Sequence, residues 1–282
     1  MKTVAITGAN GFLGSALVEH YTAAGYTVRK FVRIPRDEQS YSFDLEHGVK
    51  AGALQGVDIL IHAAHDFTPI NTEEMHRVNR EGSRKLFVQA SHAGVRVILF
   101  VSSVSAFSGS FSVYGKTKFE TEAIAEEYKG KSVRPGLIYG RDGKGMFGSL
   151  EKVVQKLPIV PLFDGGAQQM VLAHVDDLSS AILWVTEHWE EVPSVSTLAA
   201  TPPVTFRRIL EVIAEKNGKV VHFVSVPSIL ALFGLRFFEK IGIRVPFRSD
   251  SLVSLLNTDP ELGNLRLRTV SMRSLEDASG GR

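Results

Sequence analysis

The chain has 282 residues, of which 44% are hydrophobic and none is cysteine, and its 32 basic and 30 acidic residues leave a net charge of +2. This length and apolar content suffice for one large α/β domain with an appended lobe. The balanced charge argues against a nucleic-acid partner, and the lack of cysteine excludes disulfides, thiolate metal sites and a cysteine nucleophile.

The first fourteen residues, MKTVAITGANGFLG, combine a short apolar run with three evenly spaced glycines. The run Val4–Ile6 predicts a buried strand, and the small or apolar residues between Gly14 and Gly25 predict a helix. A glycine turn between them lets the backbone approach a pyrophosphate at the amino end of the helix, whereas a bare glycine pattern could be an ordinary loop. The residues that we assign to this dinucleotide site are Thr7, Gly8, Asn10, Gly11, Phe12, Leu13 and Gly14.

The spacing GxxGxxG after Thr7 resembles the extended, epimerase/dehydratase branch of the short-chain dehydrogenase/reductase superfamily, in which TGxxGFLG is typical. The resemblance implies an α/β fold: a Rossmann-like, doubly wound parallel sheet with a small C-terminal α/β substrate lobe. We expect one NAD(P)-binding domain over residues 1–282, with the lobe formed mainly by residues 141–170 and 200–275.

The end of the second expected strand, Tyr26–Val32, bears on the choice of cofactor. An acidic residue at this point binds the adenosine ribose of NAD, whereas basic residues accommodate the 2′-phosphate of NADP. Val32 stands where the acid would be, and Arg33 and Arg36 follow. The sequence therefore favours NADP over NAD, although solvated loop arginines would give the same pattern.

Two further motifs resemble segments that border the cofactor in this branch. Asp44-Leu45 stands where an aspartate and an apolar residue lie beside the adenine ring, and Ala63-Ala64 belongs to a match to the DxVxHxAA motif. We interpret His62 in that motif as a structural residue at a strand end. No second group of ligands lies nearby in sequence, so we expect no metal site.

A strand over Val95–Val101 ends at Ser102 and Ser103, and the pair Tyr114 and Lys118 follows. Residues four apart share one helix face, and an ammonium beside a phenol favours the phenolate, so we expect Lys118 to lower the pKa of Tyr114. The pattern YxxxK is common by chance, but its place after a glycine turn and a Ser-Ser strand end indicates proton transfer. The resemblance implies a triad of Ser103, Tyr114 and Lys118, with Ser102 as the alternative serine.

The segment Val133–Gly140 resembles the RPGxxYG stretch beside the nicotinamide, and implies that Pro135 and Gly136 pass close to the ring. Other positions depart from the branch. Leu137 replaces an asparagine and Met170 replaces an arginine, both of which help to hold a sugar nucleotide's phosphates in related enzymes. The loop before the tyrosine also lacks their acidic, proline-containing insert. Since charged hydrogen bonds carry much of such affinity, a nucleotide-sugar substrate is doubtful.

The last third predicts a helix over Phe206–Asn217, a strand over Val220–Val226 and further helix from Pro227. The stretch Ser228–Ile243 is strongly apolar, but it is too short to span a membrane and contains charged residues. We interpret it as a core or lobe helix with one charged face, with a membrane-surface or partner-binding helix as the alternative. The apolar character of the whole last third suggests a lipophilic or small carbonyl substrate, or a packing surface.

These features predict an NAD(P)-dependent oxidoreductase, preferring NADP, that transfers hydride at a carbonyl/alcohol carbon. The alternatives are a nucleotide-sugar epimerase or dehydratase, and a non-catalytic NADP-binding sensor or assembly protein that docks through the apolar stretch. We expect a small-molecule substrate, no nucleic-acid partner and no transmembrane segment, and a homodimer stays open. The N-terminus shows no secretory signal pattern, so we expect a cytoplasmic protein.

Overall fold

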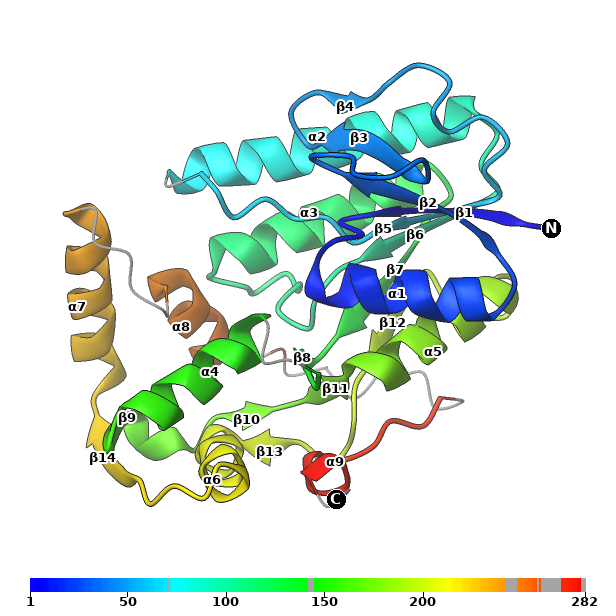
Figure 1. The fold of residues 1–282 in the computed structure, drawn as a ribbon. Helices are drawn as coiled ribbons and strands as arrows, with labels where there is room; N and C mark the ends of the chain where they lie inside the picture. Colours follow the sequence, from blue (N-terminus) through cyan, green and yellow to red (C-terminus); the bar gives the residue numbers. More distant parts are fainter. Residues whose placement is uncertain (70, 142–144, 242–247, 258, 260–269, 280–282) are drawn as a thin grey trace.

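A mostly parallel sheet forms the centre of the computed structural model, which describes residues 1–69, 71–141, 145–241, 248–257, 259 and 270–279 (Figure 1). The strand order is β12-β7-β6-β5-β1-β2-β3-β4, and only β3 and β4 pair antiparallel. The strands are β1 (Thr3–Thr7), β2 (Thr27–Val32), β3 (Ser40–Asp44), β4 (Gly48–Val49), β5 (Ile59–His62), β6 (Val97–Val101), β7 (Lys131–Pro135) and β12 (Val195–Leu198). The order reverses between β1 and β5, and ligands of doubly wound sheets bind at the carboxyl ends of the strands at this point.

Helices cover both faces of this sheet. They are α1 (Phe12–Ala23) and α5 (Val175–Glu187) on one face, and α2 (Thr72–His92) and α3 (Val113–Glu127) on the other. Side chains of β1 alternate between the faces: Val4 and Ile6 join the core under α1 and α5, and Ala5 joins the core under α2 and α3. The alternation explains why the strand is apolar throughout, and the expected doubly wound fold is confirmed.

The segment Val133–Gly140 contains parts of two strands. Its first part lies in β7, and its second part, β8 (Leu137–Tyr139), pairs with β11 (Leu172–His174) outside the main sheet. Gly136 lies between them, where a Cβ atom would be 2.5 Å from the carbonyl oxygen of Val171. The chain leaves the main sheet at the residue that allows this close approach.

A third core lies in the C-terminal part and includes Leu162, Ile209 and Leu210. It is enclosed by helices and by two-stranded sheets that pair β9 with β14 and β10 with β13. These small sheets agree with the expected C-terminal α/β unit. The elements of this part are α4 (Gly145–Lys156), β9 (Ile159–Phe163), η1 (Asp164–Gly166), β10 (Gln169–Met170), β13 (Val204–Thr205), α6 (Phe206–Lys216), β14 (His222–Val226), α7 (Ser228–Lys240), α8 (Ser249–Leu256) and α9 (Leu275–Ser279).

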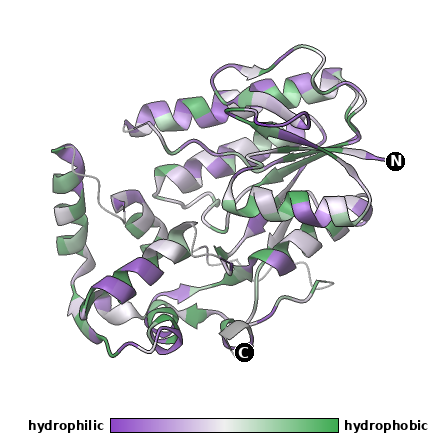
Figure 2. Cartoon of the chain, in the orientation of Figure 1, coloured by the Kyte–Doolittle hydropathy of each residue, from purple (hydrophilic) through white to green (hydrophobic). Residues whose placement is uncertain are grey.

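The apolar stretch that begins at Ser228 forms α7 as expected, and of the two alternatives, a core helix or a lobe helix, the core helix is wrong. None of the 13 residues of α7 is buried, and Phe233 and Phe237 are 75% and 54% exposed. Figure 2 shows the largely apolar α7 at the edge of the molecule. Residues 242 and 243 of the stretch lie outside the described residues. Among the described helices, none is long and apolar enough to cross a bilayer.

Candidate functional site

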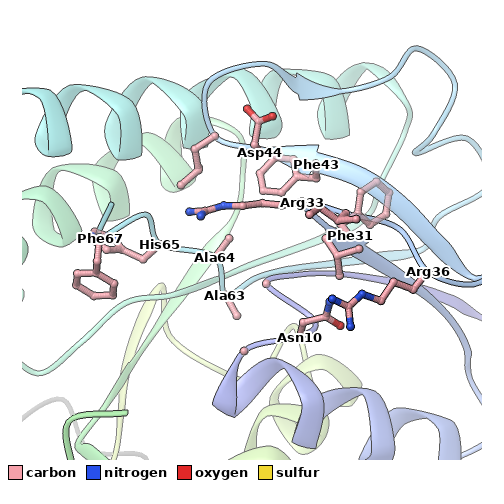
Figure 3. Close-up of a pocket in the computed structure, with 15 residues that line it drawn as sticks. Asn10, Phe31, Arg33, Arg36, Phe43, Asp44, Ala63, Ala64, His65 and Phe67 are labelled. Atoms are coloured by element: carbon pink, nitrogen blue, oxygen red, sulfur yellow. The ribbon is translucent and has the colours of Figure 1, made fainter. Parts of the chain in front are cut away.

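A cleft of about 480 Å³ opens at the carboxyl ends of β1, β2 and β5 (Figure 3). Predicted cofactor residues from four separate stretches of sequence line it: Gly8, Asn10, Gly11, Arg33, Arg36, Asp44, Leu45, Ala63 and Ala64. Phe31 and Phe43 add aromatic wall, and His65 and Phe67 lie at one end. The other residues predicted to bind the cofactor are not among those that line the cleft, namely Thr7, Phe12, Leu13, Gly14, Ser102, Pro135 and Gly136.

The glycine turn is packed so tightly that it excludes side chains. Gly8 has a φ of +69°, and the N–H of Gly11 donates to its carbonyl oxygen at 2.8 Å. A Cβ on Gly14 would lie 2.0 Å from that same oxygen. Gly11 is the N-cap of α1 and has no side chain with which to cap it. The first N–H groups of α1 therefore begin at the cleft, where a phosphate would find both donors and the positive end of the helix.

His62 belongs to a buried chain of hydrogen bonds beneath the turn. Thr7 Oγ1 lies 2.7 Å from His62 Nδ1, and Ser83 Oγ lies 2.8 Å from His62 Nε2. Because the Ser83 hydroxyl donates to the carbonyl oxygen of Asn79, it accepts from Nε2–H, and Nδ1 is then the acceptor for Thr7. Burial, with the Lys118 charge adding to it, lowers the pKa of His62 to about 3. A neutral histidine in this position holds β1, β5 and α2 together, in agreement with a structural role.

Asn79 fixes the loop that follows β5. Its Oδ1 accepts from the N–H of Asp66 at 2.7 Å, and its Nδ2 donates to the carbonyl oxygens of Asp66 and Met75 at 2.8 and 2.7 Å. This loop carries His65 and Phe67 at the end of the cleft. An asparagine on α2 thus sets where the cleft ends.

The two arginines after β2 lie differently in the cleft. Arg33 extends across it and forms an ion pair with Asp66 at 2.6 Å. Arg36 points toward Asn10 beside the glycine turn (Figure 3), and within the described residues it forms no ion pair. The guanidinium of Arg36, unlike that of Arg33, is therefore available to bind an anion beside the glycine turn.

Asp44 is engaged with the turn between β3 and β4. Its Oδ1 accepts from the N–H groups of Glu46 and His47 at 2.9 and 2.7 Å. The His47 ring nitrogen Nδ1 lies 2.9 Å from the same oxygen. Asp44 thus shapes the wall of the cleft at this end, beside Leu45.

Tyr114, at the start of α3, packs against the end of the cleft. Its ring centroid lies 5.0 Å from that of His65 and 5.7 Å from that of Phe67. The Ser103 side chain lies near its hydroxyl and acts to lower the pKa of Tyr114. The Ser103 hydroxyl oxygen also accepts from the N–H of Ser105 at 3.2 Å. The structure thus places the predicted Tyr114 and Ser103 side chains near each other.

Lys118 lies one turn further along α3 and is almost fully buried. Its Nζ donates to the carbonyl oxygen of Val101 at 2.7 Å and lies 4.6 Å from the Phe100 ring centroid and 5.8 Å from that of Tyr114. Burial lowers the pKa of Lys118 to about 7, with Glu122 acting in the opposite direction. The lysine therefore sits between the end of β6 and the tyrosine.

The expectation that Lys118 lowers the pKa of Tyr114 is wrong for this structure. Burial raises the pKa of Tyr114 to about 12, and the nearby Ser103 side chain only partly opposes this. A buried ammonium whose own pKa has fallen to about 7 carries less charge at neutral pH, and desolvation of the phenol outweighs it. As the protein stands, Tyr114 is a neutral hydrogen-bond donor.

Several side chains of this site have a role that the sequence motifs do not show. Asp250 at the start of α8 accepts from the backbone N–H groups of Val113 and Tyr114. Arg134, in the RPG segment, forms a buried two-point ion pair with Glu122 of α3 at 2.8 and 2.7 Å. Glu122 follows the YxxxK lysine by four positions, so helical spacing could have pointed to it, whereas Asp250 had no local signal.

His65 adds an unexpected polar group at the end of the cleft. Its Nε2 is buried and has no hydrogen-bond partner within the described part of the chain. Burial first, and the nearby cations next, lower its pKa well below the usual value, so the imidazole is neutral. A buried nitrogen beside Tyr114 without a partner is a group that a bound molecule can satisfy.

No cluster of metal-ligating side chains occurs in the regions that the structure describes. The model of the NAD dependent epimerase/dehydratase family matches residues 4–198, which include β1, the glycine turn, the YxxxK pair and β12. The chain belongs to this family. Members of the family are NAD(P)-dependent oxidoreductases and epimerases.

Both reductases and epimerases are among the relatives. Ceramide reductase of Caulobacter vibrioides is 33% identical over 193 residues, which are 64% of this chain and 59% of the reductase. Cinnamoyl-CoA reductase 2 of Medicago truncatula is 32% identical over 36% of this chain and 35% of its own length. The chain thus spans less than two thirds of either reductase. UDP-glucose 4-epimerase of Vibrio cholerae is 24% identical over 93% of this chain and 90% of the epimerase.

Solved structures share the fold over most of the chain. MoeE5 in complex with UDP-glucose and NAD has a TM-score of 0.73 at 18% identity, covering 98% of this chain and 96% of MoeE5. UDP-glucose 4-epimerase of Thermotoga maritima with UDP-glucose has a TM-score of 0.66 at 20% identity, covering 80% and 85%. At these identities the likeness establishes the fold.

Proposed function

We propose that this chain is an NADP-preferring oxidoreductase that transfers hydride at the carbon of a carbonyl/alcohol pair, with Ser103, Tyr114 and Lys118 as its reacting side chains. One observation carries the proposal: the glycine-lined cleft ends at His65 and Phe67, and Tyr114 packs directly against both. A dinucleotide laid from the glycine turn along the cleft would bring its far end toward the phenol.

The residues present fit such a cofactor. Gly8 and Gly11 line the cleft and have no side chains, so the backbone of the turn is within reach of a pyrophosphate there. The amino end of α1 would hold the phosphates, Leu45 would face the adenine, and Arg36 would meet a 2′-phosphate. When bound, the nicotinamide supplies or accepts the hydride.

The chain's own groups would manage the proton. In the direction of reduction, the neutral Tyr114 hydroxyl donates its proton to the substrate oxygen as negative charge develops there. Ser103, which lies near that hydroxyl, would donate a hydrogen bond to the same substrate oxygen. Lys118, whose pKa of about 7 lies near neutrality, can then stabilise the phenolate that is left.

Two positions support a substrate other than a nucleotide sugar. Leu137 and Met170 stand where related enzymes place donors for the diphosphate, and both side chains pack against the apolar core of the C-terminal part. Neither side chain offers a hydrogen-bond donor or a positive charge to a diphosphate, which favours a substrate without one, such as a lipophilic ketone or alcohol. The name of ceramide reductase, a relative over part of the chain, points to the same class of substrate.

The test measures NADPH oxidation by the purified protein with a panel of apolar ketones of increasing chain length. Replacing Tyr114 with phenylalanine removes the proton donor, so we expect kcat to fall by roughly 100-fold or more while the dissociation constant for NADPH stays unchanged. The matched control is Tyr128→Phe, at the other end of α3. Full activity in the Tyr114→Phe variant would refute the proposal. Interconversion of UDP-hexoses without net NADPH oxidation would instead establish an epimerase.

A further inference from the structure

The outward face of α7 is apolar and carries no cover within the described structure. Five large apolar residues of this stretch are 53% to 75% exposed: Ile229, Leu230, Phe233, Phe237 and Ile241. A helix that is apolar on all sides is normally buried, because each exposed side chain of this size forgoes the gain of leaving water. The face therefore suits an apolar environment that the described residues do not provide.

The inward face of α7 is already used. Ala231, Leu232 and Leu235 pack against the core of the C-terminal part. Glu239, the one acidic residue of α7, is also turned inward, and its carboxylate accepts from the N–H of Ser249 at 2.8 Å and from the Ser249 hydroxyl at 2.6 Å. The outward apolar residues thus take no part in the packing of the described fold.

The charges that remain exposed on α7 are both positive. Arg236 and Lys240 are exposed and lie four positions apart, so they share one flank of the helix. Helical spacing places Ile229 and Phe233 on the same side of the helix as Arg236 and Lys240, closer to its amino end. The outward face thus combines an apolar stripe with a cationic flank, while the carboxylate that could offset it faces away.

We propose that α7 lies on the surface of a membrane that contains anionic lipids. Its apolar residues would enter the boundary between headgroups and acyl chains, and Arg236 and Lys240 would meet the lipid phosphates. Thirteen residues make a helix of about 20 Å, which suits lying in the interface and is too short to cross it.

The proposal goes beyond the enzymatic function and does not depend on it. The experiment measures cosedimentation of the purified full chain with vesicles of phosphatidylcholine alone, or mixed in equal parts with phosphatidylglycerol. We expect binding to the mixed vesicles that is on the order of tenfold tighter than to phosphatidylcholine, and that weakens with added salt.

Two pairs of variants separate the apolar and the charge contributions. Phe233→Ser with Phe237→Ser should weaken binding to mixed vesicles by tenfold or more. The matched control, Phe111→Ser with Phe119→Ser, also removes two exposed phenylalanines but outside α7, and should leave binding unchanged.

Arg236→Glu with Lys240→Glu should abolish the preference for phosphatidylglycerol. The matched control of equal charge, Lys2→Glu with Lys50→Glu, should retain it. Thermal unfolding followed by circular dichroism establishes that each variant is folded.

Three outcomes would overturn the proposal. The first is no binding of the folded protein to either vesicle, and the second is an equal loss in the α7 variants and their controls. The third comes from light scattering: a mass of twice 30.9 kDa that returns to the single-chain value in the Phe233→Ser, Phe237→Ser variant would show that a second copy covers α7 instead.

Discussion

The carboxylate of Asp250 accepts the backbone N–H of Tyr114 at 3.1 Å, across 136 positions of the sequence. Its other oxygen accepts the N–H of Val113 at 2.7 Å. The side chain of Ser112, the N-cap of α3, accepts a hydrogen bond from the N–H of Gly115. The first turn of α3, which carries the phenol, is therefore held jointly by its own cap and by the start of α8.

Removing this contact should impair catalysis more than stability. In Asp250→Ala, two N–H groups lose their acceptor, so we expect the free energy of unfolding to fall by about 1 kcal/mol, as for the loss of a helix cap. Because Tyr114 would lose its fixed position, kcat should fall about tenfold while the dissociation constant for NADPH is unchanged. Steady-state kinetics and urea unfolding measure the two effects.

Two variants distinguish positioning from mere stability. Asn71→Ala removes a comparable cap, that of α2, which accepts from Glu73 and Glu74. It should cost similar stability and leave kcat intact. Asp250→Asn keeps one acceptor oxygen and should recover most of the activity. If Asn71→Ala lowers kcat as much as Asp250→Ala does, Asp250 acts only through overall stability.

The two arginines of the cleft should differ in their effect on cofactor preference. Arg36→Ala should raise the dissociation constant of NADPH about tenfold and leave that of NADH unchanged, because a charged hydrogen bond to the 2′-phosphate is lost. Arg33→Ala should have a smaller effect, since Arg33 is already paired with Asp66. Calorimetric titration with both reduced cofactors measures this. An equal effect of Arg36→Ala on NADPH and NADH would contradict a 2′-phosphate contact.

Lys118 should make the stability of the protein depend on pH. The pKa of Lys118 is about 7 in the folded chain, whereas its ordinary value, which applies to the unfolded chain, is 10.5. Between these values the unfolded chain binds a proton that the folded chain does not, so stability rises with pH through this window. Below pH 7 the folded protein bears the full cost of a buried ammonium.

The variant Lys118→Met removes that cost. Near pH 6.5 it should melt roughly 5 °C above the parent protein, and this advantage should shrink toward pH 10. Thermal unfolding without cofactor, followed across this range, provides the measurement. Lys116→Met, an exposed lysine on the same helix, is the matched control and should show no such trend. A constant difference between Lys118→Met and the parent protein would mean that Lys118 is not titrating there.

The glycine turn should not accept even one methyl group at Gly14. In Gly14→Ala the new Cβ would lie 2.0 Å from the carbonyl oxygen of Gly8, so α1 and the turn must separate. We expect a loss of about 2 kcal/mol in the free energy of unfolding and at least tenfold weaker NADPH binding. Gly234→Ala, with open space at its Cβ, should be neutral or slightly stabilising. Unchanged cofactor binding in Gly14→Ala would argue against a pyrophosphate at this turn.

The central sheet could be predicted because the sequence patterns that indicate its strands are local. The strand before Gly8 and the helix after it are adjacent in sequence, and β1, β5 and β6 are short apolar runs. The order of the motifs then places their carboxyl ends on one edge. The division of the segment at Gly136 was not predictable, because it depends on Val171, which is distant in sequence.

Burial and long-range contacts explain the other differences. The composition of α7 predicts a helix, but the same apolar residues suit a core and an uncovered face, so Phe233 could not be placed from sequence. The pKa of Tyr114 depends on how His65 and Phe67 enclose it, which no spacing shows. The contact with Asp250 joins segments whose sequences give no sign of each other.

The contact between α3 and α8 also limits how such proteins can be recombined. A chimaera that kept this sheet but took its last third from a relative would leave two amide hydrogens at the start of α3 without an acceptor, unless the donor sequence offered an oxygen at the place of Asp250. An exchange of C-terminal segments to alter selectivity would therefore have to retain an acceptor oxygen at the position of Asp250. Without it, the exchange would also displace Tyr114.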